Sequence, residues 1–340
     1  MPSKSRETWS SRAGFVLAAS GAAIGLGNIQ RFPYITAQCG GGAFLMLYLL
    51  CVLLLGIPLI LVEFSIGRKT QRGPAFAFHT IKESRMWGFF GFLSVLTAFS
   101  ILCYYIVPAG WAVGFSVLAL GTKSITLSEF TQNSSYTIGS TAALLTMSAM
   151  TVRLGLRGGV EKLSKYIMPC LFAILVILVI NSLTLPDSMD GVVYYLSPDF
   201  SKIDGKVVLL ALSQAFFSLC IGEAVLITYG SYAPAEEKLI TTASLIALFD
   251  TLVAVLSGLI VFPALSSFKI EPQEDLGLIY EIMPKVFAAM PFGGVFNFLF
   301  FLLLAFAALT TSIALLEICV SFLTELTKIS RKKASFSVSL

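Results

Sequence analysis

The stretch GAAIGLGNIQRFP, from Gly21 to Pro33, decides the fold, because it places three glycines, an asparagine and an arginine inside an apolar segment. A helix that breaks at membrane depth leaves backbone N–H and C=O groups without partners, and each such group costs several kcal/mol in hydrocarbon. A break of this kind is tolerated where it lines a cavity or binds a ligand. The stretch therefore predicts a broken membrane helix with a ligand site at the break.

The chain around this stretch is more apolar than a soluble globular protein, since 56% of its 340 residues are hydrophobic and 12% are charged. A membrane span needs roughly 20 mainly apolar residues to cross a hydrocarbon core about 30 Å thick. Eight spans are predicted, at residues 13–35, 43–67, 88–120, 137–153, 164–185, 206–231, 238–264 and 293–322. The fourth has the weakest signal, because it is short and rich in Ser and Thr. The sequence thus predicts an all-α polytopic membrane protein, with one transmembrane domain over residues 1–322 and a cytoplasmic C-terminal tail over residues 323–340.

Lysine and arginine residues predict the orientation, since positively charged loops beside spans stay in the cytoplasm. With the N-terminus inside, most of the 23 basic residues fall in cytoplasmic segments. The opposite side then holds only Arg31, Lys123, Lys202, Lys206, Lys269 and Lys285. We therefore predict a multi-pass protein of the cell inner (plasma) membrane, in contact with lipid and with both termini cytoplasmic. The net charge of +4 follows from this topology, so no nucleic-acid partner is implied.

Four carboxylates fall inside predicted spans: Glu63, Glu223, Asp250 and Glu317. Each costs about 2.5–3.5 kcal/mol at the centre of a membrane helix, so such groups face a cavity or a partner. Glu63 and Glu317 lie away from the span centres or near basic loop residues, which favours structural pairing. Asp250 lies near the middle of its span without a basic neighbour in the sequence. A cation from elsewhere is therefore predicted to balance the charge of Asp250.

A second interrupted span occurs in QAFFSLCIGEAVLITYGSY, residues 214–232, where Ser218, Gly222 and Glu223 break an apolar helix. By itself, this pattern fits either a kink with a buried polar network or a binding site. Its position favours the site. Two interrupted spans at corresponding places in two halves are typical of inverted-repeat transporters, whose half-helix ends and freed carbonyls hold substrate and ions. The halves would cover residues 13–185 and 206–322, and the second repeat would be incomplete.

The eighth predicted span carries a hydroxyl cluster, Thr310, Thr311 and Ser312, in AFAALTTSIALL. Most hydroxyls in membrane helices bond to a carbonyl one turn earlier. The functional alternative is that these hydroxyls supply neutral oxygen ligands to a small hard cation, since hydroxyl, amide and carbonyl oxygens suit such ions. Sodium fits this donor type, and potassium is not excluded by it.

These motifs resemble the neurotransmitter:sodium symporter family, in particular its bacterial amino-acid-transporting members of the leucine-transporter type. The resemblance covers nearly the whole chain and rests on RETWSSRAGF, GAAIGLGNIQRFPY, GIPLILVEFSIGR, FFSL with ITYGSY, and ALTTSIA. It implies an inverted-repeat transporter fold with broken first and sixth helices. It also implies sodium-coupled symport of an amino acid, or of a related small zwitterion, by alternating access across the inner membrane.

The resemblance implies two sodium ions as cofactors. The first would be held by the carbonyl of Ala23 and the side chains of Asn28, Ser218 and Asp250, together with the substrate carboxylate. The second would be held by the carbonyls of Gly21, Ile24 and Ala307 and the hydroxyls of Thr310 and Thr311. Asp250 stands where the leucine transporter has an asparagine. Its fixed negative charge would do locally what a bound chloride does in animal members, so chloride-independent transport is predicted.

The resemblance also implies a substrate pocket and two gates. The pocket would be formed by Ala22, Ala23, Leu26, Gly27, Ile101, Tyr105, Phe217, Ser218, Cys220, Glu223, Thr311 and Leu315. Tyr105 would bond the substrate carboxylate, and Phe217 would cover it. Glu223 replaces an aromatic residue of the leucine transporter, and it would either favour a polar or basic substrate side chain or turn away to pair elsewhere. Arg31 and Phe217 would belong to the outer gate, and Arg6, Tyr232 and Glu325 to the inner one.

The family has further spans beyond the eighth, whereas this sequence ends where a ninth would begin. The expectation is a C-terminally truncated or frameshifted member, or one that a separate partner chain completes. The alternative function is therefore a non-transporting relic, or a regulatory membrane protein that retains sodium and amino-acid binding. An enzyme is not predicted, because the sequence has no HExxH motif, nucleophile-elbow serine or paired catalytic aspartates.

Overall fold

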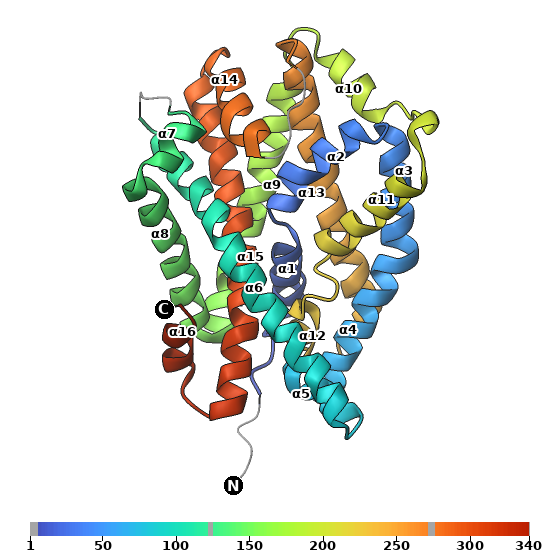
Figure 1. Cartoon of the computed structure of the whole chain (residues 1–340), viewed down its shortest axis with the longest axis vertical. Helices are drawn as coiled ribbons and strands as arrows, with labels where there is room; N and C mark the ends of the chain where they lie inside the picture. Colours follow the sequence, from blue (N-terminus) through green and yellow to red (C-terminus); the bar gives the residue numbers. More distant parts are fainter. Residues whose placement is uncertain (1–5, 122–124, 271–275, 340) are drawn as a thin grey trace.

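The computed structural model describes residues 6–121, 125–270 and 276–339. These residues are predominantly helical, and no strand occurs among them. Figure 1 shows the longer helices running side by side along one axis of the molecule, with α1 near the centre. The predicted all-α class is confirmed.

The first half of the chain begins with α1, which Ser11 caps by accepting a hydrogen bond from the Gly14 N–H. Short π-helical segments, labelled η, join several of the α-helices. The elements are, in order, α1 Arg12–Ala23, η1 Gly27–Arg31, α2 Phe32–Gln38, α3 Gly42–Cys51, η2 Val52–Gly56, α4 Ile57–Thr70, α5 Pro74–Ile81, α6 Arg85–Leu118, α7 Leu127–Gln132, α8 Ser134–Arg153, η3 Leu156–Glu161 and α9 Lys162–Leu183.

The second half contains two long helices, α13 and α15, separated by shorter elements. The 3-10 segment η4 and the π-helical segment η5 lie between α-helices. The elements are, in order, α10 Ser188–Leu196, η4 Phe200–Lys202, α11 Gly205–Ser218, α12 Val225–Gly230, α13 Leu239–Ser267, η5 Leu278–Ile282, α14 Met283–Ala288, α15 Gly293–Thr327 and α16 Arg331–Ser339.

Helices occur at all eight positions where spans are predicted. Within the described ranges, five continuous helical segments are long and apolar enough to cross a membrane: Gly42–Thr70, Arg85–Leu118, Leu156–Leu183, Leu239–Ser267 and Gly293–Thr327. The bent pair Arg12–Ala23 and Gly27–Gln38 supplies a sixth segment if it is counted as one span. The fourth predicted span (α8) and the sixth (α11 with α12) do not meet both requirements, so the count of eight stays a prediction.

The predicted tail is largely helical over its described residues, 323–339. Helix α15 continues to Thr327, and Lys328 then adopts a left-handed conformation (φ 57°) that turns the chain back. Helix α16 packs against α8 and α15, and it buries Ala334. The predicted boundary at residue 322 therefore does not coincide with the end of the last long helix.

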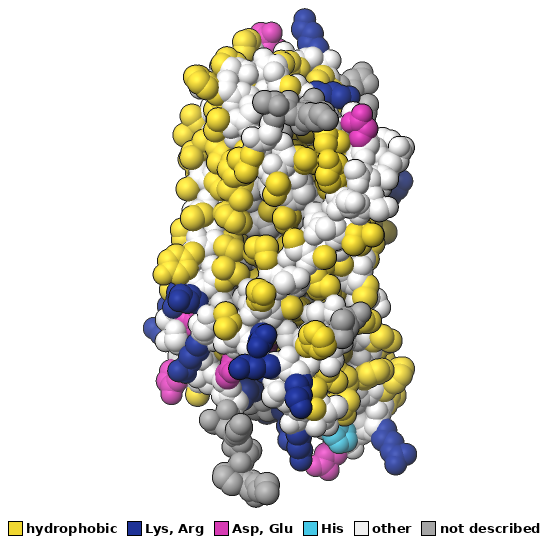
Figure 2. Space-filling view, turned by 90° about the vertical axis from the view of Figure 1, so that its left-hand side faces the viewer, with side chains coloured by type: hydrophobic (Ala, Val, Ile, Leu, Met, Phe, Trp, Pro, Cys, Tyr) yellow, Lys and Arg dark blue, Asp and Glu magenta, His cyan; other side chains and the backbone are white. Residues whose placement is uncertain are grey.

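Helix α1 lies near the centre of the bundle and packs against α9, α13 and α15. Small residues along α1 permit close approach. A Cβ atom added at Gly21 would lie 3.1 Å from the sulfur of Met168 and 3.2 Å from Cβ of Thr310. Close packing of this kind through glycine and alanine is typical of membrane helices. Figure 2 shows hydrophobic side chains over the middle of one face, with most lysines and arginines of that face toward its lower end.

Candidate functional site

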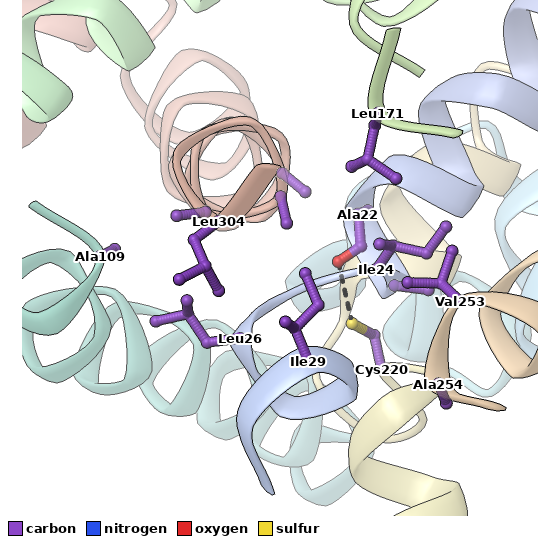
Figure 3. Packing of buried hydrophobic residues seen from close by; sticks show 14 of the residues in the cluster. Ala22, Ile24, Leu26, Ile29, Ala109, Leu171, Cys220, Val253, Ala254 and Leu304 are labelled. Atoms are coloured by element: carbon purple, nitrogen blue, oxygen red, sulfur yellow. Dashed lines mark hydrogen bonds between the residues drawn. The ribbon is translucent and has the colours of Figure 1, made fainter. Parts of the chain in front are cut away.

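The first break in the bundle lies between α1 and η1, where the chain bends by 55°. The break exposes carbonyl groups that a continuous helix would use, and tertiary contacts satisfy some of them. The carbonyl of Ala22 accepts hydrogen bonds from the Thr311 hydroxyl (3.1 Å) and from the Cys220 thiol (3.4 Å). Figure 3 shows the Cys220 sulfur facing this carbonyl. The predicted break in the first span is confirmed.

The second break separates α11, which ends at Ser218, from α12, which begins at Val225. Cys220, Gly222 and Ala224 all have positive φ, at 54°, 83° and 69°. A left-handed conformation costs a residue with a side chain about 1–2 kcal/mol, and such strain gathers at functional sites. The Gly222 N–H donates to Oε1 of Glu63 (2.8 Å), so a carboxylate from α4 holds the broken backbone. The predicted interruption of the sixth span is confirmed as well.

A buried polar cluster joins the two breaks, as the sequence predicts. The Asn28 amide donates to Oγ of Ser218 (2.9 Å) and to Oδ1 of Asp250 (2.7 Å). The Ser218 hydroxyl donates to Oδ2 of Asp250 (2.7 Å). All three side chains are at most 2% exposed. Among the residues that the structure describes, no lysine or arginine forms an ion pair with Asp250.

This cluster fits a sodium ion by its donor set. It offers a carboxylate and a hydroxyl, which are ligands for hard cations, while the Asn28 amide directs its nitrogen to both of them and its oxygen to the Gly25 N–H (3.2 Å). Ala23, the fourth predicted ligand, is the last residue of α1 and is buried beside the break. A buried carboxylate without a basic partner is costly, and a bound cation would offset that cost.

The predicted second sodium site combines α1 and α15. The Thr311 hydroxyl lies 3.4 Å from the Ile24 carbonyl oxygen and 3.2 Å from that of Ala307. The Thr310 hydroxyl donates to the Ala307 carbonyl (3.0 Å), which is the bond to a preceding turn that membrane helices commonly make. Gly21 lies beside Thr310, since a Cβ atom added to it would be 3.2 Å from Cβ of Thr310. The residues of this predicted site are therefore neighbours, and their binding of sodium stays a prediction.

Most of the predicted substrate residues lie at the same breaks or contact them. Tyr105 projects from α6 and accepts a long hydrogen bond (3.5 Å) from the Leu26 N–H. A Cβ added at Gly27 would be 2.5 Å from the Phe217 ring, so this ring packs directly on the broken backbone. Leu315 is buried on α15 and Ile101 is partly buried on α6, two helices that pack together extensively. Phe217 itself is 42% exposed.

The two predicted gates differ in their contacts. In the predicted inner gate, Arg6 forms an ion pair with Glu325 and places its guanidinium 4.6 Å from the centre of the Tyr232 ring. In the predicted outer gate, the Arg31 guanidinium lies 5.3 Å from the centre of the Phe217 ring. Both predicted groups of residues are thus brought together, and the inner group is closed by an ion pair.

Three residues that bond to predicted site residues or their neighbours could not be identified from the sequence. Tyr48, fully buried on α3, donates to Oδ2 of Asp250 (3.3 Å) from within an ordinary apolar run. Gln214 donates to the Gly27 carbonyl (3.4 Å). Arg331 on α16 forms an ion pair with Glu317, which also accepts a hydrogen bond from the Tyr232 hydroxyl (2.7 Å).

The two remaining predictions for carboxylates have different outcomes. Structural pairing of Glu317 is confirmed by Arg331. Glu63 has no ion pair within the described residues, and the backbone of the second break is its partner instead. The sequence could not distinguish these cases, because a backbone N–H freed by a break is not visible as a residue type.

Comparison with known proteins agrees with this architecture. The family model of the sodium:neurotransmitter symporter family matches residues 6–126 and 121–340. An uncharacterized sodium-dependent transporter of Haemophilus influenzae is 38% identical over 97% of this chain and 77% of its own length. The uncharacterized sodium-dependent transporter YhdH of Bacillus subtilis is 36% identical over 98% of this chain and 76% of its own length.

A solved structure is similar over the same extent. The crystal structure of MhsT in complex with L-phenylalanine superimposes with a TM-score of 0.90 and 36% identity, covering 98% of this chain and 78% of that chain. The family consists of sodium-coupled transporters in membranes, not enzymes. With the broken helices and the shared length of these matches, the chain belongs to the sodium:neurotransmitter symporter family.

Proposed function

We propose that this chain carries an amino acid, or a related small zwitterion, across the cell inner membrane together with sodium. The observation that supports this proposal most directly is the Asn28–Ser218–Asp250 cluster, which joins both helix breaks around a carboxylate that has no basic partner among the described residues. Half-helix ends beside such a cluster suit the two charges of an amino acid, since carbonyls accept from its ammonium and N-terminal ends attract its carboxylate. The crystal structure of MhsT with L-phenylalanine supports this substrate class.

The proposed cycle uses the two sodium sites and the two gates. Sodium at Asn28, Ser218 and Asp250 would neutralise the buried carboxylate and present a positive charge to the substrate carboxylate. Sodium at Thr310 and Thr311 would join α1 to α15. Sodium and substrate together favour one conformation of the bundle over another only if they bind the two conformations with different free energies. The Arg6–Glu325 ion pair would then open on the cytoplasmic side.

The proposed orientation places both termini in the cytoplasm. Figure 1 has α16 and the chain that leads into α1 in the lower half of the molecule. Figure 2 has most lysines and arginines of the visible face toward the same end. The positive-inside rule supports a cytoplasmic location for that end.

Uptake of amino acids into proteoliposomes tests the proposed function. The purified protein should accumulate label from a mixture of radioactive amino acids when sodium is outside, and replacing sodium with choline should abolish accumulation. Uptake that is the same in choline contradicts sodium coupling. Amino acids that stabilise the protein against heat only with sodium, without entering vesicles, would support the non-transporting alternative.

Replacing Thr310 with Val should weaken sodium activation without disturbing the fold. The two side chains have nearly the same shape, but valine lacks the oxygen that the second sodium site requires. We expect the sodium concentration for half-maximal uptake to rise about tenfold, which corresponds to about 1.4 kcal/mol. Thr310→Ser retains the oxygen and serves as the control. An unchanged sodium dependence in Thr310→Val would remove this residue from the proposed site.

A further inference from the structure

Glu223 is a carboxylate within the second break that the proposed sodium sites do not use. It follows Gly222 in the second break, between two residues with left-handed backbone, and is partly buried. Cys220, which belongs to the same break, donates its thiol hydrogen to the Ala22 carbonyl at the first break. Glu223 is therefore located where the two broken helices meet.

Two other side chains border the same breaks. Tyr105 on α6 accepts a hydrogen bond from the Leu26 N–H at the first break. Glu63 on α4 accepts one from the N–H of Gly222, the residue before Glu223. The second oxygen of Glu63, Oε2, is buried without a hydrogen-bond partner in the described part of the chain, and the Glu63 side chain is nine-tenths buried. Two carboxyl groups thus belong to the second break, since Glu63 is bonded to the residue before Glu223.

No basic side chain within the described residues balances this charge. The ion pairs there involve Arg6, Arg12, Lys165 and Arg331, and their partners are Glu325, Glu237, Glu161 and Glu317. Two carboxylates that share a weakly solvated region repel each other, and a cation between or beside them removes that cost. The proposed sodium ions are held by other residues, so they leave this charge unmatched.

We propose that Glu223 makes the site selective for amino acids with a cationic side chain, whose positive end forms a salt bridge with the Glu223 carboxylate. This inference rests on the proposed function, because it assumes that an amino acid binds at the breaks. An apolar substrate side chain would bury the carboxylate without a partner, which costs more than leaving it in water. A cationic side chain supplies the missing charge and a charge-assisted hydrogen bond. Glu63 is a positioning residue, since it fixes the Gly222 backbone beside Glu223.

Pairs of amino acids with the same shape and different charge test this selectivity. Lysine is compared with norleucine, and arginine with citrulline, as competitors of uptake and as ligands that raise the melting temperature in sodium. For the unaltered protein, we expect the cationic member of each pair to bind at least about tenfold more tightly, because a site built for a polar group strongly rejects the analogue that lacks it. In Glu223→Gln, the ratio of the affinity for the cationic member to the affinity for the neutral member should fall to about one or below.

Controls separate the inference from a general defect. Glu83→Gln makes the same substitution at an exposed position and should leave both ratios unchanged. Stabilisation of Glu223→Gln by alanine in sodium would show that its pocket is intact. A preference of the unaltered protein for norleucine and citrulline, or an unchanged ratio in Glu223→Gln, overturns the inference while leaving amino-acid symport in place. If no amino acid binds or enters with sodium, the proposed function fails, and this inference fails with it.

Discussion

Asp250→Asn should reduce sodium-driven uptake of labelled amino acids at least tenfold at low sodium concentration. The substitution keeps the size of the side chain and an oxygen acceptor for the Ser218 hydroxyl, but it removes the only charge in the cluster with Asn28 and Ser218. Attraction between a cation and a fixed carboxylate is strong where water is largely excluded, as it is around this fully buried residue. The sodium concentration for half-maximal uptake should therefore rise. Initial uptake rates measured across a sodium series check the effect.

Chloride provides a second measurement on the same variant. If Asp250 supplies the negative charge that would otherwise come from an anion, uptake by the unaltered protein is the same in chloride and in gluconate. Asp250→Asn should then gain a stimulation by chloride. Asp190→Asn, the same substitution at an exposed position on α10, is the matched control. A sodium dependence of Asp250→Asn that equals that of the unaltered protein would exclude Asp250 from the first sodium site.

Among the variants proposed for this protein, Glu317→Ala should lose the most stability. Glu317 is fully buried and bonded to both Arg331 and Tyr232. Burial by itself would lower the pKa of Arg331, but the charge of Glu317 raises it above its usual value, so this guanidinium stays charged. Removing one partner of a buried ion pair leaves the other charge unpaired, at a cost of about 3–5 kcal/mol. The melting temperature of the purified protein in detergent should fall accordingly.

Two further variants distinguish the ion pair from the space it fills. Glu317→Gln keeps an acceptor for the Tyr232 hydroxyl and should lose less stability than Glu317→Ala. The double variant Glu317→Leu with Arg331→Leu removes both charges, and apolar replacement of a buried pair is often neutral. It should therefore melt at a higher temperature than Glu317→Ala. A Glu317→Ala protein with an unchanged melting temperature would mean that the pair contributes nothing to the folded state.

Much of the fold could be predicted because its main signals are local. Glycine and polar residues inside apolar runs mark both breaks, and the structure has them at Ala23–Gly27 and Ser218–Val225. Helix boundaries were less predictable. Residues 323–327 extend α15, and α16 follows, because packing on α8 and the Arg331–Glu317 pair stabilise a segment that is not apolar by itself. Membrane-span prediction detects hydropathy, and it is insensitive to contacts of this kind.

The sequence by itself determined the class of the protein and the chemistry of its site. Broken apolar spans, a lone Asp250 and the hydroxyls of Thr310 and Thr311 already indicate oxygen ligands at membrane depth. Only the tertiary structure decided which groups meet. Tyr48 reaches Asp250 across a separation of 202 residues, and the carboxylate of Glu63 holds the freed amide of Gly222. The physical reason is that composition and periodicity indicate which polar groups are buried at a cost in free energy. The packing of the helices determines which group becomes the partner of each.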